Sequence, residues 1–456
     1  MSRTPHVAGR AGPEGGKPPP RARRSALNRP RGFWPLLLVF VLLVGAAAGG
    51  LALHRFGTGD RLGEETAAHR VARTPAIDLT ERSAAVAKVL ARRAEAVRRN
   101  QLSEFLADVD PGNKALLARQ RVLFGNLVQF GFSRLGYEQL REQFEQTLVE
   151  RFGPSAYVVQ VAMTYQISGI DRVPVRTMLG YTFTRQPDGR WILVDDTAVD
   201  RWLPRGSHQE AWDVGPVLVQ RAPRVLVVVE RGATALAADL AAKAVNAVRA
   251  VGRRWPGGWT GAGVVIALDD KAVRGADYTL PQNAEDALAM ATWVYRTLPG
   301  EVDSEGERAD SYVVVNPRNR AQLDARTLAH EFTHVATARY GAYAPRWLVE
   351  GVATYVEFLP MDGELDLALD KYRASMRSRY LATARGLPAD ATLFQNSKSS
   401  YPLSWLAADY LFRRFGPTKV STLYQQLATG GTSQDARNRI MLAQLGMTET
   451  GLFNAL

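Results

Sequence analysis

The residues best suited to chemistry in this chain are two histidines and two glutamates in its C-terminal half. His330, Glu331 and His334 form a His-Glu-x-x-His pattern, and Glu350 follows sixteen positions after His334. On a helix, residues four apart lie about one turn along the same face, so both imidazoles can reach one ion. A catalytic zinc site uses three protein ligands and leaves a position for water. We therefore predict that His330, His334 and Glu350 bind one Zn²⁺ per chain.

Glu331 would serve this site as a general base. It lies next to the first ligand in sequence, and its carboxylate would take a proton from a water molecule whose pKa the ion lowers toward about 7. The alternative is that the five-residue pattern arises by chance and that the histidines are polar surface. The chain has only six histidines, and a Glu-Gly pair, Glu350-Gly351, follows at a fitting distance, so we favour the metal site.

Two helices must position these residues. Asp324 or Thr327 would cap the first helix, and Gly341 follows its last good helical residue. The second helix begins near Pro345, a residue favoured in the first turn, and carries Glu350. The loop between them is short, which makes the helices antiparallel neighbours and returns Glu350 toward the histidines.

These motifs resemble the gluzincin metallopeptidases of the MA-like superfamily. In that family a Trp-x-x-Glu-Gly-x-Ala-x-Tyr segment supplies the third ligand, and residues 347–355 fill every motif position. Its aminopeptidase branch also has a tyrosine that opens a later helix, and Tyr401 is similar to it. The resemblance implies that Tyr401 donates a hydrogen bond to the oxyanion, although a packing tyrosine is the simpler alternative. It covers residues 222–456.

The chain departs from the aminopeptidase branch in one respect. We find no Gly-x-Met-Glu-Asn segment, which in that branch holds the free amine of the substrate. Upstream of the metal helix is a β-rich run, residues 311–316, which we expect to be an edge strand that pairs with an extended substrate. We therefore predict an endopeptidase.

The N-terminus carries a membrane signal. Residues 1–32 hold eight Lys and Arg against one Glu and are rich in Pro and Gly, which predicts a disordered cytoplasmic tail. Residues 33–53 contain no charge and are long enough to cross a bilayer. The positive-inside rule then leaves the rest of the chain outside the cell membrane. The alternatives are a secreted protein with a cleaved signal and, less well matched, export through a twin-arginine signal at Arg23-Arg24.

Charge and composition exclude other classes. The chain has a net charge of +12, but residues 33–456 keep only +5 of it once the tail is set apart, so nucleic-acid binding is not indicated. The partner of the tail would be the anionic inner leaflet, and the alternative is a nonspecific charge that serves solubility. The absence of cysteine excludes thiol ligands and thiol nucleophiles and fits an extracytoplasmic protein without disulfides.

A second folded region is expected between the membrane and the metal site. Residues 54–79 would form a stalk, and residues 80–205 would begin with helices that run to residue 151. Strands would follow at 157–167, 175–184 and 190–195, the last two joined by a Pro-Asp-Gly turn. This order resembles the cone fold of the nuclear-transport-factor-like superfamily. The aromatic residues expected to fill or close it, with core favoured over a ligand pocket, are Tyr165, Tyr181, Trp191 and Trp202.

We thus predict an α+β protein with a transmembrane helix, a cone-fold domain and a zincin-type domain with a mixed-sheet lobe and a helical lobe. Its predicted function is that of a membrane-anchored, extracytoplasmic zinc peptidase acting on peptides or proteins. The alternative is a noncatalytic cell-envelope binding or assembly protein in which the zinc lobe is a structural or peptide-binding module.

Overall fold

The computed structural model describes residues 79–198, 200, 207–275, 287–298, 307–341, 343–359 and 367–456. This part of the chain is a mixed α+β structure with two β-sheets, as expected. The predicted tail and membrane segment, residues 1–32 and 33–53, lie outside it, as does nearly all of the predicted stalk. Within the described ranges, no helix has the length and apolar character needed to cross a bilayer.

The first sheet is antiparallel and follows three helices. The helices are α1 (Leu79–Arg98), α2 (Leu102–Leu106) and α3 (Lys114–Phe130). The strands, in the order in which they pair, are β1 (Phe132–Gln143), β2 (Tyr157–Ile167), β3 (Val175–Arg185) and β4 (Trp191–Asp195), with α4 (Gln146–Phe152) between β1 and β2. The hairpin between β3 and β4 turns at Gly189, whose φ of 87° suits glycine.

The prediction that helix continues from residue 116 to residue 151 was wrong. Gly131 takes a left-handed conformation, with φ 60°, and ends α3. The next twelve residues form β1, which pairs with β2 along most of its length. The long-range pairing with β2 therefore overrides a local pattern that had suggested helix.

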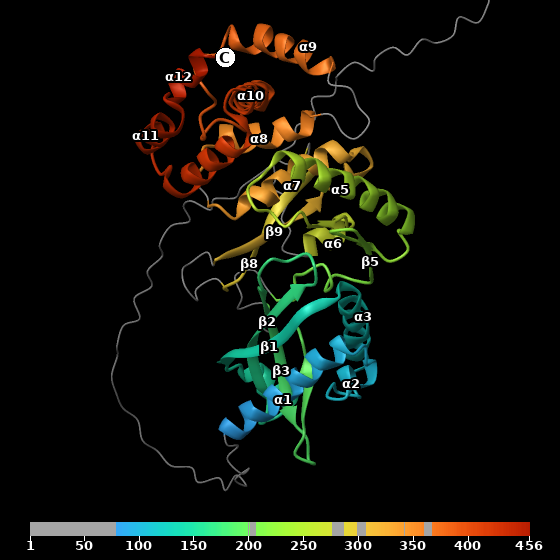
Figure 1. Cartoon of the computed structure of the whole chain (residues 1–456). Helices are drawn as coiled ribbons and strands as arrows, with labels where there is room; N and C mark the ends of the chain where they lie inside the picture. The colour runs from blue at the N-terminus through green and yellow to red at the C-terminus, as the bar shows by residue number, and fades with distance from the viewer. Residues whose placement is uncertain are drawn as a thin grey trace, which may run out of the picture. The chain divides into compact units, whose positions relative to one another are not determined.

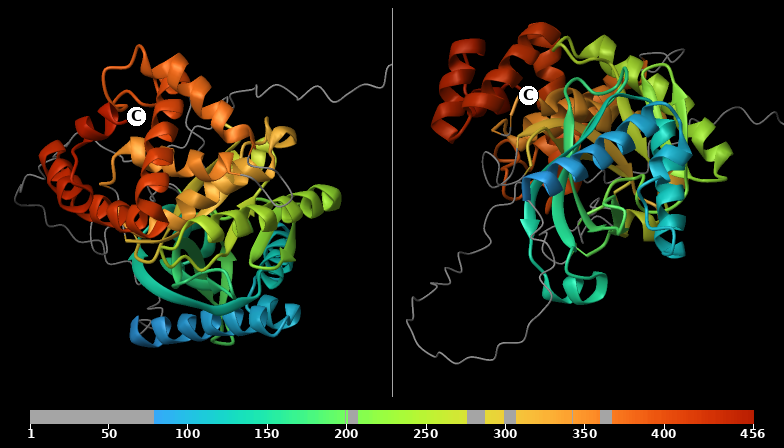
Figure 2. Two further views of the ribbon diagram at one scale, coloured as in Figure 1. Left: turned by 45° about the horizontal axis from the view of Figure 1, so that its top comes forward. Right: turned by 90° about the horizontal axis from the view of Figure 1, so that it is seen from below.

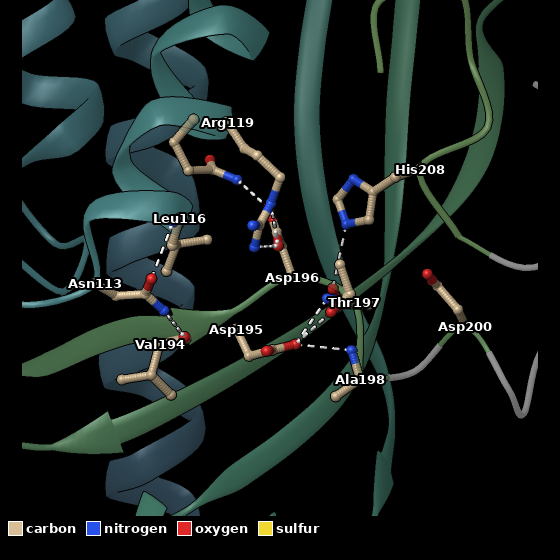
Figure 3. A network of polar contacts seen from close by, with 12 residues as sticks. Asn113, Leu116, Arg119, Val194, Asp195, Asp196, Thr197, Ala198, Asp200 and His208 are labelled. Carbon is tan, nitrogen blue, oxygen red and sulfur yellow. Dashed lines mark hydrogen bonds and ion pairs between the residues drawn. The ribbon is translucent and has the colours of Figure 1, made fainter. Parts of the chain in front are cut away.

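Polar contacts fix the end of β4 to α3 (Figure 3). Arg119 of α3 donates from Nη2 to Oδ1 of Asp196 over 2.6 Å, and Gln120 donates to Oδ2 over 2.7 Å. Asp195 accepts from the backbone amides of Thr197 and Ala198, each over 2.8 Å. Tyr165, Tyr181 and Trp191 are buried in this region, whereas Trp202 lies outside the described residues.

The second sheet is mixed, and the helix that carries His330 and His334 packs against it. Its strands, in spatial order, are β5 (Val217–Ala222), β6 (Val225–Glu230), β7 (Gly263–Ile266), β9 (Arg308–Val315) and β8 (Ala289–Tyr295). Strands β6, β7 and β9 are parallel, and the two outer strands are antiparallel to their neighbours. Helices α5 (Thr234–Arg254) and α7 (Ala325–Ala338) pack side by side against this sheet (Figures 1 and 2), and α6 (Asp270–Gly275) follows β7.

The edge strand of this sheet differs from the one predicted. Residues 311–316 were expected to form the edge, but β9 pairs with β7 on one side and β8 on the other. The edge on this side of the sheet is β8, whose central residues Ala291 and Trp293 pair with Val313 and Ser311 of β9. A strand order of this kind depends on pairing between distant segments, so local sequence does not reveal it.

The remainder of the described chain is helical. A short 3₁₀ turn (Arg320–Gln322) precedes α7, and α8 (Arg346–Phe358) follows it. Then come α9 (Leu367–Met376), a π-helical turn (Arg377–Leu381), α10 (Ser397–Gly430), α11 (Gln434–Leu445) and α12 (Glu449–Asn454). Helix α10 bends at Gly416, whose backbone angles are not helical, and so has two arms.

One apolar cluster runs through both sheets of the described chain, from Val86 of α1 to Val314 of β9. Polar contacts reinforce it where α3 meets β5. The side-chain amide of Asn126 donates to the carbonyls of Trp212 and Gly215 and accepts from the amide of Val217 over 3.0 Å. The predicted domain limits, 80–205 and 222–456, remain predictions.

Candidate metal centre

The histidines lie on a helix whose start is fixed by capping. Asp324 accepts the backbone amide of Thr327 over 2.8 Å, as one of the two predicted caps would. Arg326 in the first turn of α7 donates to the carbonyls of Glu357 and Leu359, over 3.0 and 3.2 Å, and so joins the start of α7 to the end of α8. His330 and His334 follow on the same buried face.

Glu350 is held in place by the packing of α8 on α10. A Cβ atom on the next residue, Gly351, would lie 2.4 Å from the carbonyl oxygen of Ser404, so only glycine allows the two backbones to approach this closely. At the start of α8, the indole of Trp347 donates to Glu449 of α12 over 2.8 Å. Pro345 is the residue just before α8 rather than in its first turn.

The three predicted ligands converge. Glu350 Oε2 lies 3.5 Å from His330 Nε2 and 3.7 Å from His334 Nε2, and all three side chains are at most 4% exposed. None of these three atoms makes a well-aligned hydrogen bond. Buried polar atoms normally have partners, and two imidazoles with one carboxylate form a donor set that suits a divalent metal. The residues therefore fit a metal ion, and His330, His334 and Glu350 could bind one.

Glu357 orients His330, a role that the sequence analysis missed. Its Oε2 lies 2.9 Å from His330 Nδ1, on the far side of the ring from Nε2. Such a contact fixes the tautomer that leaves Nε2 available for a metal, and it makes the imidazole a better donor. Glu357 lies seven residues after Glu350, two turns along the same face of α8. This spacing could have predicted that Glu357 also faces the histidines.

Glu331 is completely buried beside the three ligands. Burial raises the pKa of its carboxyl to about 8, although His330 and the nearby amide of Ala291 in β8 act to lower it. Neither carboxylate oxygen forms a well-aligned hydrogen bond in the described structure. The group is therefore available to exchange a proton near neutral pH.

The pKa values of the two histidines are shifted in opposite directions. Burial lowers the pKa of His330, but contacts with Glu350 and Glu357 raise it more, to about 10. Burial and the charge of His330 hold the pKa of His334 well below its usual value. Burial also raises the pKa of Glu350, which His330 and Tyr401 act to lower. Without a metal, one proton thus resides on His330.

Tyr401 lies near the cluster, in the first turns of α10. Its ring centroid is 6.4 Å from that of His330, and its hydroxyl contacts Glu350. The side chain is 9% exposed. All five residues predicted for the site are therefore brought together, and Tyr401 contacts the carboxylate ligand in the arrangement seen here.

A hollow opens beside His334. Its wall is formed by the edge strand, by α7 and α8, and by Tyr424 of α10. The small residues Ala291, Ala338 and Ala344 face it, with Trp293 and Ser311 from the sheet. The cluster is therefore buried but adjoins a space beside an edge strand.

Comparison of the chain with protein families, curated proteins and solved structures found no match. The account of this site consequently depends on its residues and their geometry.

Proposed function

We propose that this protein is a zinc-dependent peptidase that cleaves within its substrates. One observation carries the proposal: three ligand atoms, none of which makes a well-aligned hydrogen bond, meet in a buried cluster, with the buried carboxylate of Glu331 at their side. The ligand types favour zinc, since imidazole and carboxylate without thiolate are the set that hydrolytic zinc sites use. Burying a carboxylate costs free energy, and the nearby amide of Ala291 offsets only part of this cost, because the pKa of Glu331 stays raised.

The residues can be given roles in peptide hydrolysis. Zn²⁺ on His330, His334 and Glu350 would supply a Lewis acid that polarises the substrate carbonyl and acidifies water. Glu331 would take a proton from the attacking water and deliver it to the leaving amine nitrogen. Glu357 would hold His330 in the ligating tautomer. Burial raises the pKa of Glu331 in the metal-free chain, and a bound cation would lower it again, toward the ionised form that accepts a proton.

Tyr401 would stabilise the oxyanion. A phenol is a neutral donor at working pH and lies close enough to the ligands to face a carbonyl held there. Its hydroxyl now contacts Glu350, so this role requires it to turn from the carboxylate toward the substrate.

The edge strand supports an endopeptidase. An extended substrate can add to the free edge of β8, which borders the hollow beside His334. The residues of β8, Ala289–Tyr295, include no carboxylate that could bind a free amino terminus. The observed edge thus favours the same class as the predicted one did.

The finer assignments belong to this proposal. We infer a gluzincin-like domain of the MA-like superfamily at residues 222–456, with the mixed sheet as one lobe and α8 to α12 as the other. Residues 80–205 would form a nuclear-transport-factor-like cone. A membrane helix at 33–53 would hold both outside the cell, unless the leader is cleaved and the protein secreted.

The competing proposal is a noncatalytic cell-envelope protein with structural zinc. A structural site needs a closed set of ligands and no base. The position of Glu331 argues against it.

Metal content and cleavage test the proposal. The purified full-length chain should contain about one zinc, and His330→Ala should lose it, whereas His69→Ala in the predicted stalk should not. The zinc-loaded protein should cleave members of a broad peptide library at internal bonds. A chain that holds no metal, or one that holds zinc and cleaves nothing, contradicts the proposal.

A further inference from the structure

A second hollow adjoins the one beside His334. Trp293 of β8 and Ala338 of α7 line both. The second hollow is also lined by Trp259 and by three arginines, Arg172, Arg308 and Arg339. The space beside the metal cluster therefore continues along the edge strand into a region of positive charge.

Two of these arginines have no acidic partner among the residues that the structure describes. The guanidinium of Arg308 lies 3.9 Å from the ring centroid of Trp293, which holds it in place by a cation–π contact. Arg339 donates from Nη1 to the carbonyl of Gly258 over 2.7 Å. Neither forms an ion pair with any carboxylate of the described residues. Both guanidinium groups are thus held in position while their charges remain uncompensated there.

One acid, Asp310, also lines the second hollow. Burial raises its pKa to about 6, while the amide of Ser311 and the charge of Arg172 act to lower it. Arg172 is therefore the arginine that compensates Asp310. The charge that remains belongs to Arg308 and Arg339.

The distance between the cluster of three ligands and Arg339 fits a peptide that lies along β8. Arg339 follows His334 by five residues on α7 and lies just after the helix, so it is about 7.5 Å farther along the axis. An extended peptide covers this distance in two to three residues at about 3.3 Å each. A side chain at that position would reach the arginines while a peptide bond lies beside the cluster.

We propose that Arg308 and Arg339 form a subsite that binds a carboxylate of the peptide, two to three residues from the bond that is cleaved. The carboxylate belongs either to an acidic side chain, as in an endopeptidase substrate, or to the free C-terminus, in which case the protein would release short C-terminal peptides. Guanidinium groups bind both in the same way. The inference rests on the proposed peptidase function and names the substrate class of that site.

Binding can be measured apart from cleavage. The full-length Glu331→Gln chain is titrated with three fluorescent peptides by anisotropy. The first carries one Glu at the stated distance and has blocked ends. The second has Gln in its place, and the third has the Gln with a free C-terminus. We expect one of the two carboxylate peptides to bind about tenfold more tightly than the blocked Gln peptide, in keeping with a charge-assisted hydrogen bond.

The peptide that gains affinity identifies the source of the carboxylate. Arg308→Gln and Arg339→Gln, each introduced into the Glu331→Gln chain, should reduce the preference toward equality. Arg121→Gln, at an exposed position of α3, makes the same charge change elsewhere and should leave the preference intact. Equal affinity for all three peptides, or a preference that survives both arginine substitutions, overturns the subsite.

Failure of the subsite differs from failure of the peptidase. Cleavage by the wild-type chain without any preference for a carboxylate would support the peptidase and contradict the subsite. If a carboxylate peptide binds in a way that depends on the arginines but the zinc-loaded wild type never cleaves it, the result would support the subsite and contradict the peptidase.

Discussion

At the scale of single residues, the cluster is built so that a metal must displace a proton. In its absence His330 holds one, because contacts with Glu350 and Glu357 raise the pKa of its ring to about 10. Below this pKa protons compete with the metal for the ring, so affinity should increase as pH rises toward it. Calorimetric titrations of zinc at pH 7 in buffers of different ionisation enthalpy should show release of at least one proton per ion. Binding without proton release contradicts this assignment.

The contact between His330 and Glu357 should control metal affinity. Glu357→Gln keeps the shape of the side chain but removes the charge that orients the ring and strengthens its donor nitrogen. We expect zinc affinity to fall by about 10- to 100-fold, measured by competition with a chelator. The matched variant Glu104→Gln, on the exposed surface of α2, should bind zinc like the wild type. Unchanged affinity in Glu357→Gln would remove Glu357 from the metal site.

The sequence predicted most of the residues of this site, and the reason is geometric. The ligands His330 and His334 lie one turn apart on one helix, and Glu350 returns on the next helix after a short loop, so local rules place all three. The role of the amide of Ala291 could not be predicted in this way. Its approach to Glu331 depends on which strand lies at the edge, and that is decided by pairing between distant segments.

At the scale of helices and strands, the site depends on the close approach of α8 and α10. A methyl group at residue 351 would meet the backbone of Ser404, which cannot turn aside as a flexible side chain can. Gly351→Ala should therefore separate the helices, lower the free energy of unfolding by about 1–3 kcal/mol and weaken zinc binding by moving Glu350. Denaturant unfolding and metal competition measure the two effects.

An exposed helical glycine provides the control for this substitution. Nothing lies within 4 Å of a Cβ built on Gly252 of α5. Gly252→Ala should raise the unfolding free energy by about 0.5–1 kcal/mol, because alanine is the better helix former. If Gly351→Ala behaves in the same way, the close contact does not constrain Glu350.

The elements that the sequence predicted well were those with strong local signals. The strands 157–167 and 175–184 and the turn at Gly189 appear within a residue or so of their predicted limits. The helix that carries His330 and His334 begins after one of its predicted caps, Asp324, but ends at Ala338, two residues short of the limit set by Gly341. Strand β1 was missed because most of its residues are polar or charged, only Leu135 is buried, and its pairing is with a distant strand. The edge position was wrongly predicted for β9 for a similar reason, because the residues of a strand do not specify which strands pair with it.

At the scale of the whole molecule, a buried carboxyl group joins the two sheets. Asp171 follows β2, where its Oδ2 accepts from the amide of Ile167 over 2.6 Å. Its Oδ1 accepts from the hydroxyl of Tyr312 in β9 over 2.9 Å. Burial raises the pKa of this carboxyl to about 7, despite both hydrogen bonds.

This shift gives the fold a pH dependence of known sign. The unfolded chain releases the Asp171 proton near pH 4, whereas the folded chain keeps it until about pH 7. The contribution of Asp171 to stability is therefore greatest below pH 4 and declines as pH rises to 7, by at most about 4 kcal/mol. Denaturant unfolding between pH 4 and 7 should show this decline flattened in Asp171→Asn.

This prediction concerns how the unfolding free energy changes with pH, not its value at any one pH. Asparagine can accept only one of the two hydrogen bonds and will lower stability at every pH. Asp310, whose pKa burial raises to about 6, adds a similar slope that both chains share. Equal slopes in wild type and Asp171→Asn would contradict the assignment.

The central claim is that Glu331 is the base of a zinc hydrolase site. The most direct measurement compares zinc content and peptide cleavage in the wild-type chain and in Glu331→Gln. We predict about one zinc in each and a loss of cleavage of about 10²- to 10⁴-fold in the variant, since the glutamine cannot accept the proton of the attacking water. Equal cleavage by two chains that both hold zinc would contradict the claim.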